Sequence, residues 1–210
     1  MTESEWLTAT DPQRMLEHIR GTASDRELRL FAAACCCQTF AADSDTLRPR
    51  LEAEKQGVEL TERIAEGESS PSDPLTYHYE FYTIFHSFGS SLEEGCHAAT
   101  SSDPWEAASE VVKRLNDDWA DGEDNIGVKV AREIFGNPFR PITFAESWRT
   151  ETAVALAAGI YADRAFDRLP ILADALEEAG CDHPDVLTHC RSPGPHARGC
   201  WVVDGVLGQS

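Results

Sequence analysis

Signals that start and stop helices recur along this chain, and they constrain its fold more than any other feature. Thr2 and Ser24 each precede a glutamate by three residues, which is the capping-box pattern that opens a helix. Aspartate-proline pairs supply an N-cap and a first-turn proline at Asp11-Pro12, Asp73-Pro74 and Asp103-Pro104. Apolar residues recur between these signals at helical spacing, and no alternating strand pattern of useful length occurs. The sequence predicts an all-α fold, an irregular bundle of about eight or nine helices forming a single domain over residues 1–210.

The last third of the chain continues in the same style. Residues 147–165 predict an apolar helix, which we expect to be the most buried one. Asp167 is expected to cap the next helix, with Pro170 at its third position, and Asp182 to cap the one after it. A stiff Pro-Gly-Pro loop then precedes a last apolar helix from about Ala197 to Leu207.

Periodic apolar faces also predict the core. Each predicted core residue lies on the apolar side of an expected helix, where three- and four-residue spacing lines up side chains. These residues are Phe31, Phe81, Phe85, Leu115, Leu156, Ile160, Leu172 and Leu176.

The charge balance excludes some partners. The chain has 18 Lys and Arg against 37 Asp and Glu, a formal net charge of −19. Such a surface repels polyanions, so nucleic acid and anionic membranes are excluded as partners, and a basic protein partner fits the charge better. The longest weakly polar stretches, 31–42 and 152–162, are shorter than the ~20 residues that span a bilayer. The acidic N-terminus is not a signal peptide, and we expect a cytoplasmic protein.

Seven cysteines occur, three of them consecutive at Cys35-Cys36-Cys37. Neighbouring helical residues point about 100° apart and cannot form a disulfide with each other, so reduced thiols are expected. A redox or nucleophilic thiol is the alternative, but no CxxC motif occurs, and cysteine in an apolar helix commonly packs as a compact hydrophobe.

The candidate metal site is the C-terminal group His189, Cys190, His196 and Cys200, with the spacing H-C-x5-H-x3-C. Structural zinc takes four nitrogen or sulfur ligands, and thiolate with imidazole favours zinc over magnesium or calcium. With the last helix beginning near Ala197, Asp204 would lie on the same face as Cys200. The spacing matches no standard zinc finger, and the competing interpretation is a helix-end histidine, a buried thiol and a proline-stiffened turn, which we favour.

Two other groups of polar residues are better explained as ordinary structure than as sites. Asp163 and Asp167 could serve a hydrolase as paired carboxylates, but each lies beside an arginine, which favours an ion-pair network. His78, Tyr82 and His86 share a helix face beside an aromatic stripe, and such a stripe is more typical of core than of a haem or di-metal site. Phosphate-binding loops, Rossmann glycines and the HExxH and GxSxG motifs are absent.

Four sequence blocks carry a family resemblance. They are EWL…DPQRMLEHIRGTASDRELRLFAAACC (5–36), IFGNPFRPI (134–142), AFDRLPILADALEEAGCD (165–182) and HCRSPGPHARGCWVVDGVLG (189–208). Together they resemble a large uncharacterised paralogous protein family of planctomycete bacteria. The family-like regions are 1–42 and 126–210, with a variable helical insert expected at 43–125. No activity is established for that family, so the resemblance implies no catalytic residue and no cofactor. A basic pair is expected after Cys35-Cys36, where this chain has Cys37-Gln38.

The favoured function is a non-enzymatic helical module for protein interaction or regulation, because the surface is acidic and no catalytic motif stands out. A zinc-binding protein that uses the C-terminal Cys/His cluster is the alternative. A hydrolase that uses the Asp163 and Asp167 region is the third.

Overall fold

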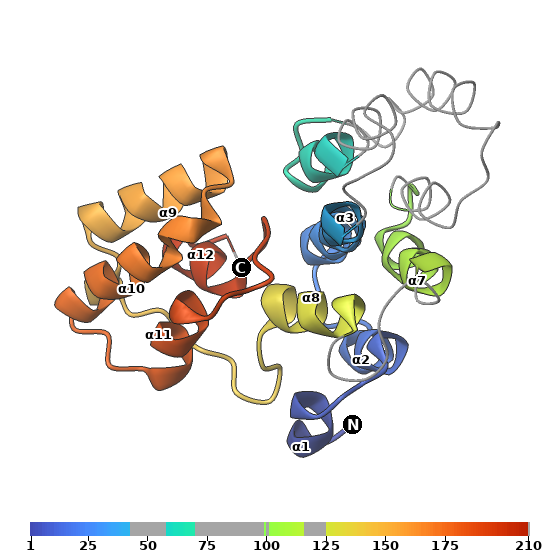
Figure 1. Ribbon diagram of the computed structural model, residues 1–210, viewed down its shortest axis with the longest axis horizontal. Helices are drawn as coiled ribbons and strands as arrows, with labels where there is room; N and C mark the ends of the chain where they lie inside the picture. The colour runs from blue at the N-terminus through green and yellow to red at the C-terminus, as the bar shows by residue number, and fades with distance from the viewer. Residues whose placement is uncertain (43–57, 70–98, 100, 116–124, 210) are drawn as a thin grey trace. The chain divides into compact units, whose positions relative to one another are not determined.

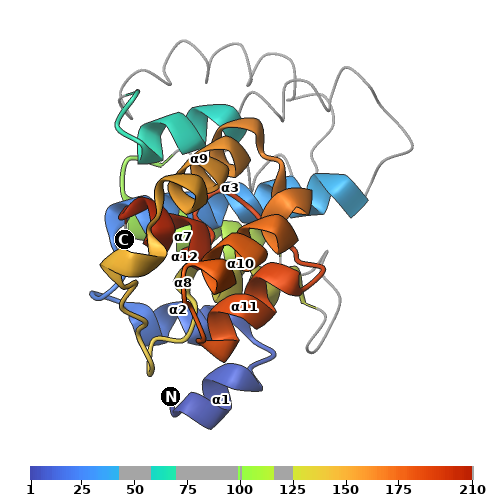
Figure 2. The ribbon, with the colours of Figure 1, turned by 90° about the vertical axis from the view of Figure 1, so that its left-hand side faces the viewer.

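The computed structural model describes residues 1–42, 58–69, 99, 101–115 and 125–209 (Figures 1 and 2). Within these residues every regular element is an α- or 3-10 helix and none is a strand, which confirms the all-α class. The chain divides into two compact units, Met1–Arg132 and Glu133–Ser210. The division falls within α8 (Ile126–Phe135). The single domain expected over residues 1–210 stays a prediction.

The first unit contains the predicted N-terminal helices. Besides the start of α8 they are α1 (Glu3–Leu7), α2 (Pro12–Ile19), α3 (Asp25–Ala42), a helix at 58–65 and α7 (Pro104–Leu115). Both capping boxes are formed: the amide of Glu5 donates to the hydroxyl of Thr2 at 3.3 Å, and that of Glu27 to Ser24 at 3.2 Å. Asp11 caps α2 through its side chain, and Asp103 accepts the Glu106 amide at 2.9 Å.

Two arginines secure the first unit by donating to backbone carbonyls. In this unit α7 packs against α3 and α2. Buried Arg29 on α3 donates to the carbonyls of Ser101 and Ser102 just before α7, at 2.8 and 2.7 Å. Arg132 on α8 donates to three carbonyls at the end of α1 and just beyond it, those of Trp6, Leu7 and Ala9. Each guanidinium thereby ties carbonyls at a helix end or just outside a helix to another part of this unit.

The second unit is built from short helices around an apolar C-terminal one. They are η3 (Glu146–Trp148), α9 (Glu151–Asp163), η4 (Phe166–Arg168), α10 (Leu169–Glu178), α11 (Pro184–Arg191) and α12 (Trp201–Leu207). α10 packs against α9 and α11, and α12 also contacts both α9 and α11 (Figure 1). Val202, Val203 and Val206 of α12 are fully buried in this core.

Several predicted helix ends in this unit are wrong. The helix expected over 147–165 is interrupted at Thr150, whose hydroxyl accepts the Ala153 amide and begins α9 there. Asp167 lies inside η4 instead of capping α10, and Pro170 falls in the first turn of α10. His183, not Asp182, is the N-cap of α11, because Pro184 occupies the first helical position.

The last helix, α12, is shorter than predicted. It is also more buried than α9, which was expected to be the most buried helix. α12 begins at Trp201 instead of Ala197, since residues 197–200 form a turn closed by the Cys200 amide on the Ala197 carbonyl at 3.1 Å. α9 buries Ala153, Ala157 and Ile160. α12 buries five of its seven residues and is the more enclosed helix.

Half of the predicted core residues are confirmed. Phe31, Ile160, Leu172 and Leu176 are fully buried. Leu156 is half-buried and packs against the core of the second unit. Phe81 and Phe85 lie outside the described residues. For Leu115 the structure describes the backbone but not the side chain.

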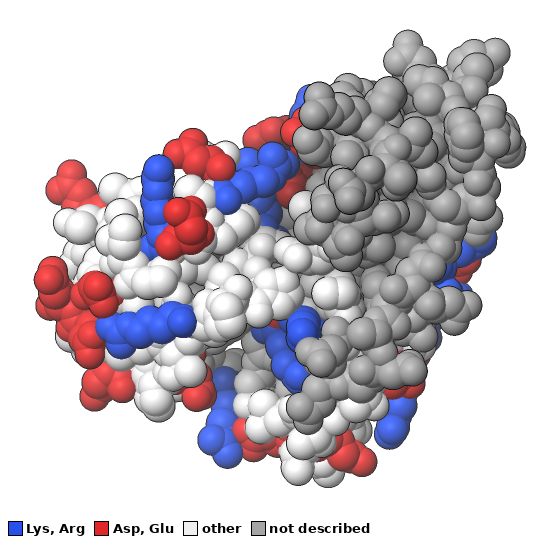
Figure 3. Space-filling view, in the orientation of Figure 1, with Lys and Arg blue, Asp and Glu red and all other residues white. Residues whose placement is uncertain are grey.

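The described surface mixes both signs of charge. Figure 3 shows acidic and basic side chains interspersed over the described residues of one face. Arg191, for example, lies 2.8 Å from Asp174 and 2.7 Å from Glu177. Among the residues the structure describes, no helix is both long enough and apolar enough to cross a membrane.

Candidate metal centre

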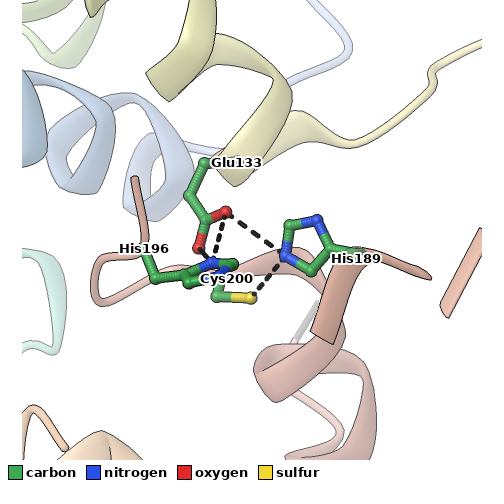
Figure 4. Close-up of side chains that lie close together, drawn as sticks. All are labelled: Glu133, His189, His196 and Cys200. Atoms are coloured by element: carbon green, nitrogen blue, oxygen red, sulfur yellow. Dashed lines mark hydrogen bonds and ion pairs between the residues drawn. The ribbon is translucent and has the colours of Figure 1, made fainter. Parts of the chain in front are cut away.

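Four side chains with metal-ligating atoms converge in the second unit: Glu133, His189, His196 and Cys200 (Figure 4). One ligand atom from each lies within 4.8 Å of all the others. Glu133 comes from the last turn of α8, His189 from the last turn of α11, His196 from the following loop, and Cys200 from the residue before α12. In the described part of the chain this is the one such group of three or more His, Cys, Asp or Glu residues.

Glu133 is the acceptor at the centre of the group. Its Oε2 lies 3.1 Å from Nδ1 of His196 and 3.2 Å from Nε2 of His189, and the amide of Ala197 donates to its Oε1 at 3.3 Å. Its side chain is only 3% exposed. Burial alone raises the pKa of Glu133, but the hydrogen bonds from His189 and His196 outweigh it and leave the pKa below its ordinary value. Glu133 is therefore a buried carboxylate in the ionised form.

His196 is positioned by the loop that follows α11. Gly194 has a φ of +95°, and a Cβ there would lie 2.8 Å from the His196 backbone nitrogen, so the turn requires glycine. Nε2 of His196 donates to the Ser192 carbonyl at 3.1 Å, which directs Nδ1 at Glu133. Burial alone lowers the pKa of His196, but the hydrogen bond and charge of Glu133, together with the Ser192 carbonyl, raise it above its ordinary value.

His189 has a different partner on each ring nitrogen. Nε2 faces the site, 3.2 Å from Oε2 of Glu133 and 3.2 Å from Sγ of Cys200. Nδ1 faces away and accepts the indole N–H of Trp201 at 3.2 Å. Arg191, two residues further along α11, forms ion pairs with Asp174 and Glu177 of α10 and so ties this end of α11 to its neighbour.

Cys200 is the fully buried N-cap residue of α12. The turn before it is tied to the end of α9 by Arg198, which donates to the carbonyls of Tyr161 and Ala162 at 3.1 and 3.2 Å. Arg198 also lies over the Tyr161 ring at 5.2 Å. Burial, followed by the charge of Glu133, raises the pKa of the Cys200 thiol well above its ordinary value.

The structure brings together three of the four predicted ligands and replaces the fourth. His189, His196 and Cys200 belong to the group, whereas Cys190 is buried in the apolar core of the second unit and does not. Burial, followed by the charge of Glu133, raises the pKa of Cys190 to about 12. Asp204, expected beside Cys200, is buried in α12 and is also not a member.

Glu133 is not among the ligands predicted from the sequence. It lies 63 residues before His196, outside the Cys/His cluster. The sequence nevertheless contains a sign that Glu133 is buried. It lies three residues after Val130 and directly before Ile134, and both of these residues are buried on the same helix. A glutamate on the apolar face of a helix is rarely buried unless it is paired, so it marks a polar site.

The other sequence candidates do not form sites in the described residues. Asp163 and Asp167 are both exposed, and Asp163 lies 3.8 Å from Arg168 in a surface ion pair. The six described cysteines form no disulfide with one another, as expected for reduced cysteines. Cys35 and Cys36 are buried, as compact hydrophobes are, whereas Cys37 is exposed. The expected helix carrying His78, Tyr82 and His86 lies outside the described residues.

The geometry does not fit nucleophilic catalysis by Cys200. In a catalytic triad one histidine nitrogen faces the nucleophile and the other faces the orienting acid. Here Nε2 of His189 faces both Cys200 and Glu133, while Nδ1 faces Trp201. The raised thiol pKa also opposes a free thiolate. Convergent sulfur, nitrogen and oxygen ligands are instead what a metal ion takes.

Comparison with known protein families, with curated proteins and with solved structures finds no match to this chain.

Proposed function

We propose that the second unit binds one zinc ion through Glu133, His189, His196 and Cys200, and that this ion has a structural role. The observation that carries the proposal is the convergence of these four ligand atoms within 4.8 Å in a buried place. Two imidazoles, one thiol and one carboxylate are all established zinc ligands. A thiol combined with imidazoles disfavours magnesium and calcium, which take oxygen ligands.

The distances between ligand atoms support this assignment. Zinc bonds of about 2.0–2.3 Å at tetrahedral angles place ligand atoms about 3.3–3.7 Å apart. The pairs Glu133–His196, Glu133–His189 and His189–Cys200 lie 3.1, 3.2 and 3.2 Å apart, and all four ligand atoms lie within 4.8 Å of one another, so binding an ion requires side-chain shifts of about an ångström or less. Metal contact would also deprotonate the thiol, whatever its pKa in the metal-free protein.

Burial supports a structural ion over a catalytic one. Catalytic zinc commonly keeps one position for water or substrate and uses three protein ligands. Here four protein side chains are available, and Glu133, His196, His189 and Cys200 are 3%, 8%, 16% and 0% exposed. Zinc would then hold the end of α8, the end of α11 and the start of α12 to one point.

The test is metal content and its dependence on the ligands. We expect one zinc per chain in protein purified without chelator, by elemental analysis and native mass spectrometry. Glu133→Gln and Cys200→Ser should lose most of it. Cys190→Ser is the matched control, because it makes the same thiol-to-hydroxyl change at a buried cysteine beside the site but outside the group.

Cobalt substitution gives a second measurement on the same variants. Co²⁺ bound by a thiolate shows a sulfur-to-metal charge-transfer band, which should persist in Cys190→Ser and vanish in Cys200→Ser. Circular dichroism of each variant separates loss of metal from loss of fold. Wild-type protein without zinc, or a band that depends on Cys190 instead of Cys200, contradicts the proposal.

A structural zinc site is compatible with the non-enzymatic interaction or regulatory module inferred from the sequence. Structural zinc shapes a surface and performs no reaction, so both roles can belong to one protein. The basic protein partner, the cytoplasmic location and membership of the planctomycete family stay predictions. The cytoplasmic location bears most directly on the zinc proposal, because a reducing cytoplasm keeps Cys200 available as a thiol.

A further inference from the structure

Trp201 makes the hydrogen bond that determines which nitrogen of His189 carries a proton. The indole Nε1–H can donate but not accept, and it lies 3.2 Å from Nδ1 of His189. The two ring centroids are 5.1 Å apart. Nδ1 must therefore present its lone pair to Trp201. Because a neutral imidazole has a single N–H, the proton of His189 lies on Nε2, the nitrogen that faces Glu133.

This arrangement differs from that of His196. A metal-ligating histidine commonly donates one N–H to a carbonyl or carboxylate and binds metal with the other nitrogen. For His196 the outer nitrogen Nε2 already donates to the Ser192 carbonyl, so a metal at Nδ1 displaces only the proton that Nδ1 donates to Glu133. For His189 the outer nitrogen is instead the acceptor of the Trp201 N–H, so a metal at Nε2 requires the ring proton to move from Nε2 to Nδ1.

We propose that Trp201 restrains metal binding by holding His189 in the tautomer that cannot bind a metal ion. This inference rests on the proposed zinc site. To ligate zinc through Nε2, His189 would have to give up its Nε2 proton and take one from solvent on Nδ1, so that the ring stays neutral and the Nε2 lone pair is available. Nδ1–H and the indole N–H are then two donors facing each other, and their hydrogen bond is lost.

The surroundings of Trp201 hold the indole in this place. It packs edge-on to Phe144, with centroids 6.2 Å apart. Gly136, which follows α8, has a φ of +58°, and a Cβ there would lie 3.2 Å from the indole ring, so the missing side chain makes room for Trp201. Metal binding at His189 would therefore break the hydrogen bond of an indole that is packed in place at the start of α12.

The decisive variant is Trp201→Phe, which keeps an aromatic ring and removes the N–H. We expect its zinc affinity to rise about 3- to 10-fold, since the metal no longer competes with one net hydrogen bond. A merely structural role for Trp201 predicts the opposite sign, because a loosened site binds metal more weakly. Trp148→Phe is the matched control: Trp148 also packs on Phe144, at 6.1 Å, and should leave the affinity unchanged.

The measurement is competition of each folded protein with a chromophoric zinc chelator at fixed pH. Zinc bound with equal or lower affinity by Trp201→Phe overturns the role of Trp201 and leaves the proposed site standing. No zinc bound by the wild type overturns the proposed site itself. Nitrogen-15 NMR of the metal-free wild type tests the basis of the inference without any metal: we expect a protonated Nε2 on His189, and a protonated Nδ1 refutes it.

Discussion

Replacing Gly205 by alanine should destabilise the second unit, although alanine is the better helix former. Gly205 lies in the middle of α12 and is buried. A Cβ at this position would lie 2.1, 2.3 and 2.6 Å from three atoms of the Phe144 ring. Real Cβ atoms essentially never approach other heavy atoms so closely, so the ring has to move.

The size of the effect follows from what holds the ring. Phe144 is in edge contact with Trp148 at 6.1 Å and with Trp201 at 6.2 Å, so its displacement disturbs two further aromatic rings. Overpacking of this kind costs about 1–3 kcal/mol. Alanine returns about 1 kcal/mol through helix propensity. With three ring atoms in conflict we expect the upper part of the range, a net loss of about 1–2 kcal/mol.

Gly159→Ala is the matched control. Gly159 lies within α9, and a Cβ there would meet nothing within 4 Å. This variant should therefore gain about 0.5–1 kcal/mol from propensity alone. Urea unfolding followed by circular dichroism, analysed with a common m-value, gives both changes in the free energy of unfolding. The reasoning is refuted if Gly205→Ala is as stable as Gly159→Ala.

Other perturbations have equally definite outcomes. Leu172→Ala should lower the free energy of unfolding by about 2–5 kcal/mol, because the side chain is fully buried; urea unfolding measures it. Arg149→Met should cost about 1–2 kcal/mol in the same assay, because two carbonyls at the end of α12 lose their donor. In native protein a thiol reagent should modify Cys37 ahead of the buried described cysteines, as mass spectrometry would show. The Glu133–His196 pair should stabilise metal-free protein fully only between about pH 4.3 and 6.5, the two unfolded pKa values. The folded protein has a lowered pKa for Glu133 and a raised pKa for His196. The stabilisation is therefore lost as the pH falls through the folded pKa of Glu133, and also as it rises through the folded pKa of His196. Glu133→Gln should flatten the profile of unfolding free energy against pH.

Helix starts were predictable where the capping residue and its target lie within one turn. Thr2 with Glu5 and Ser24 with Glu27 close their boxes over three residues, so no distant part of the fold decides them. The same holds for Asp11, which caps α2 through its own side chain.

The predicted start of the last helix was wrong, because tertiary contacts decide which of several possible start residues is used. Residues 197–199 were expected to open the last apolar helix, yet they belong to a turn. In the structure the Ala197 amide donates to Glu133 and the Arg198 side chain to carbonyls at the end of α9. These partners are distant in sequence, so propensity within the segment could not reveal the late start of α12 at Trp201.

The same limit explains the candidate site. His189, His196 and Cys200 were predictable because ligand-forming residues concentrate in one short stretch. Cys190 met the same criterion, but the structure places it in the apolar core, while its neighbour His189 occupies the side of α11 that faces the group. Only the fold brings Glu133 to the group, from another helix.

The second unit should keep its helices when the proposed metal is removed. Zinc fingers unfold without zinc because their ligands have no alternative partners and their cores are small. Here Glu133 has donors from both histidines, His196 has the Ser192 carbonyl, and His189 has Trp201. The apolar core between α9, α10, α11 and α12 is formed by residues other than these ligands, apart from Cys200. Chelation should therefore lower the urea midpoint while the helical circular dichroism signal remains, and loss of that signal on chelation would show that the hydrogen bonds of the metal-free site do not suffice.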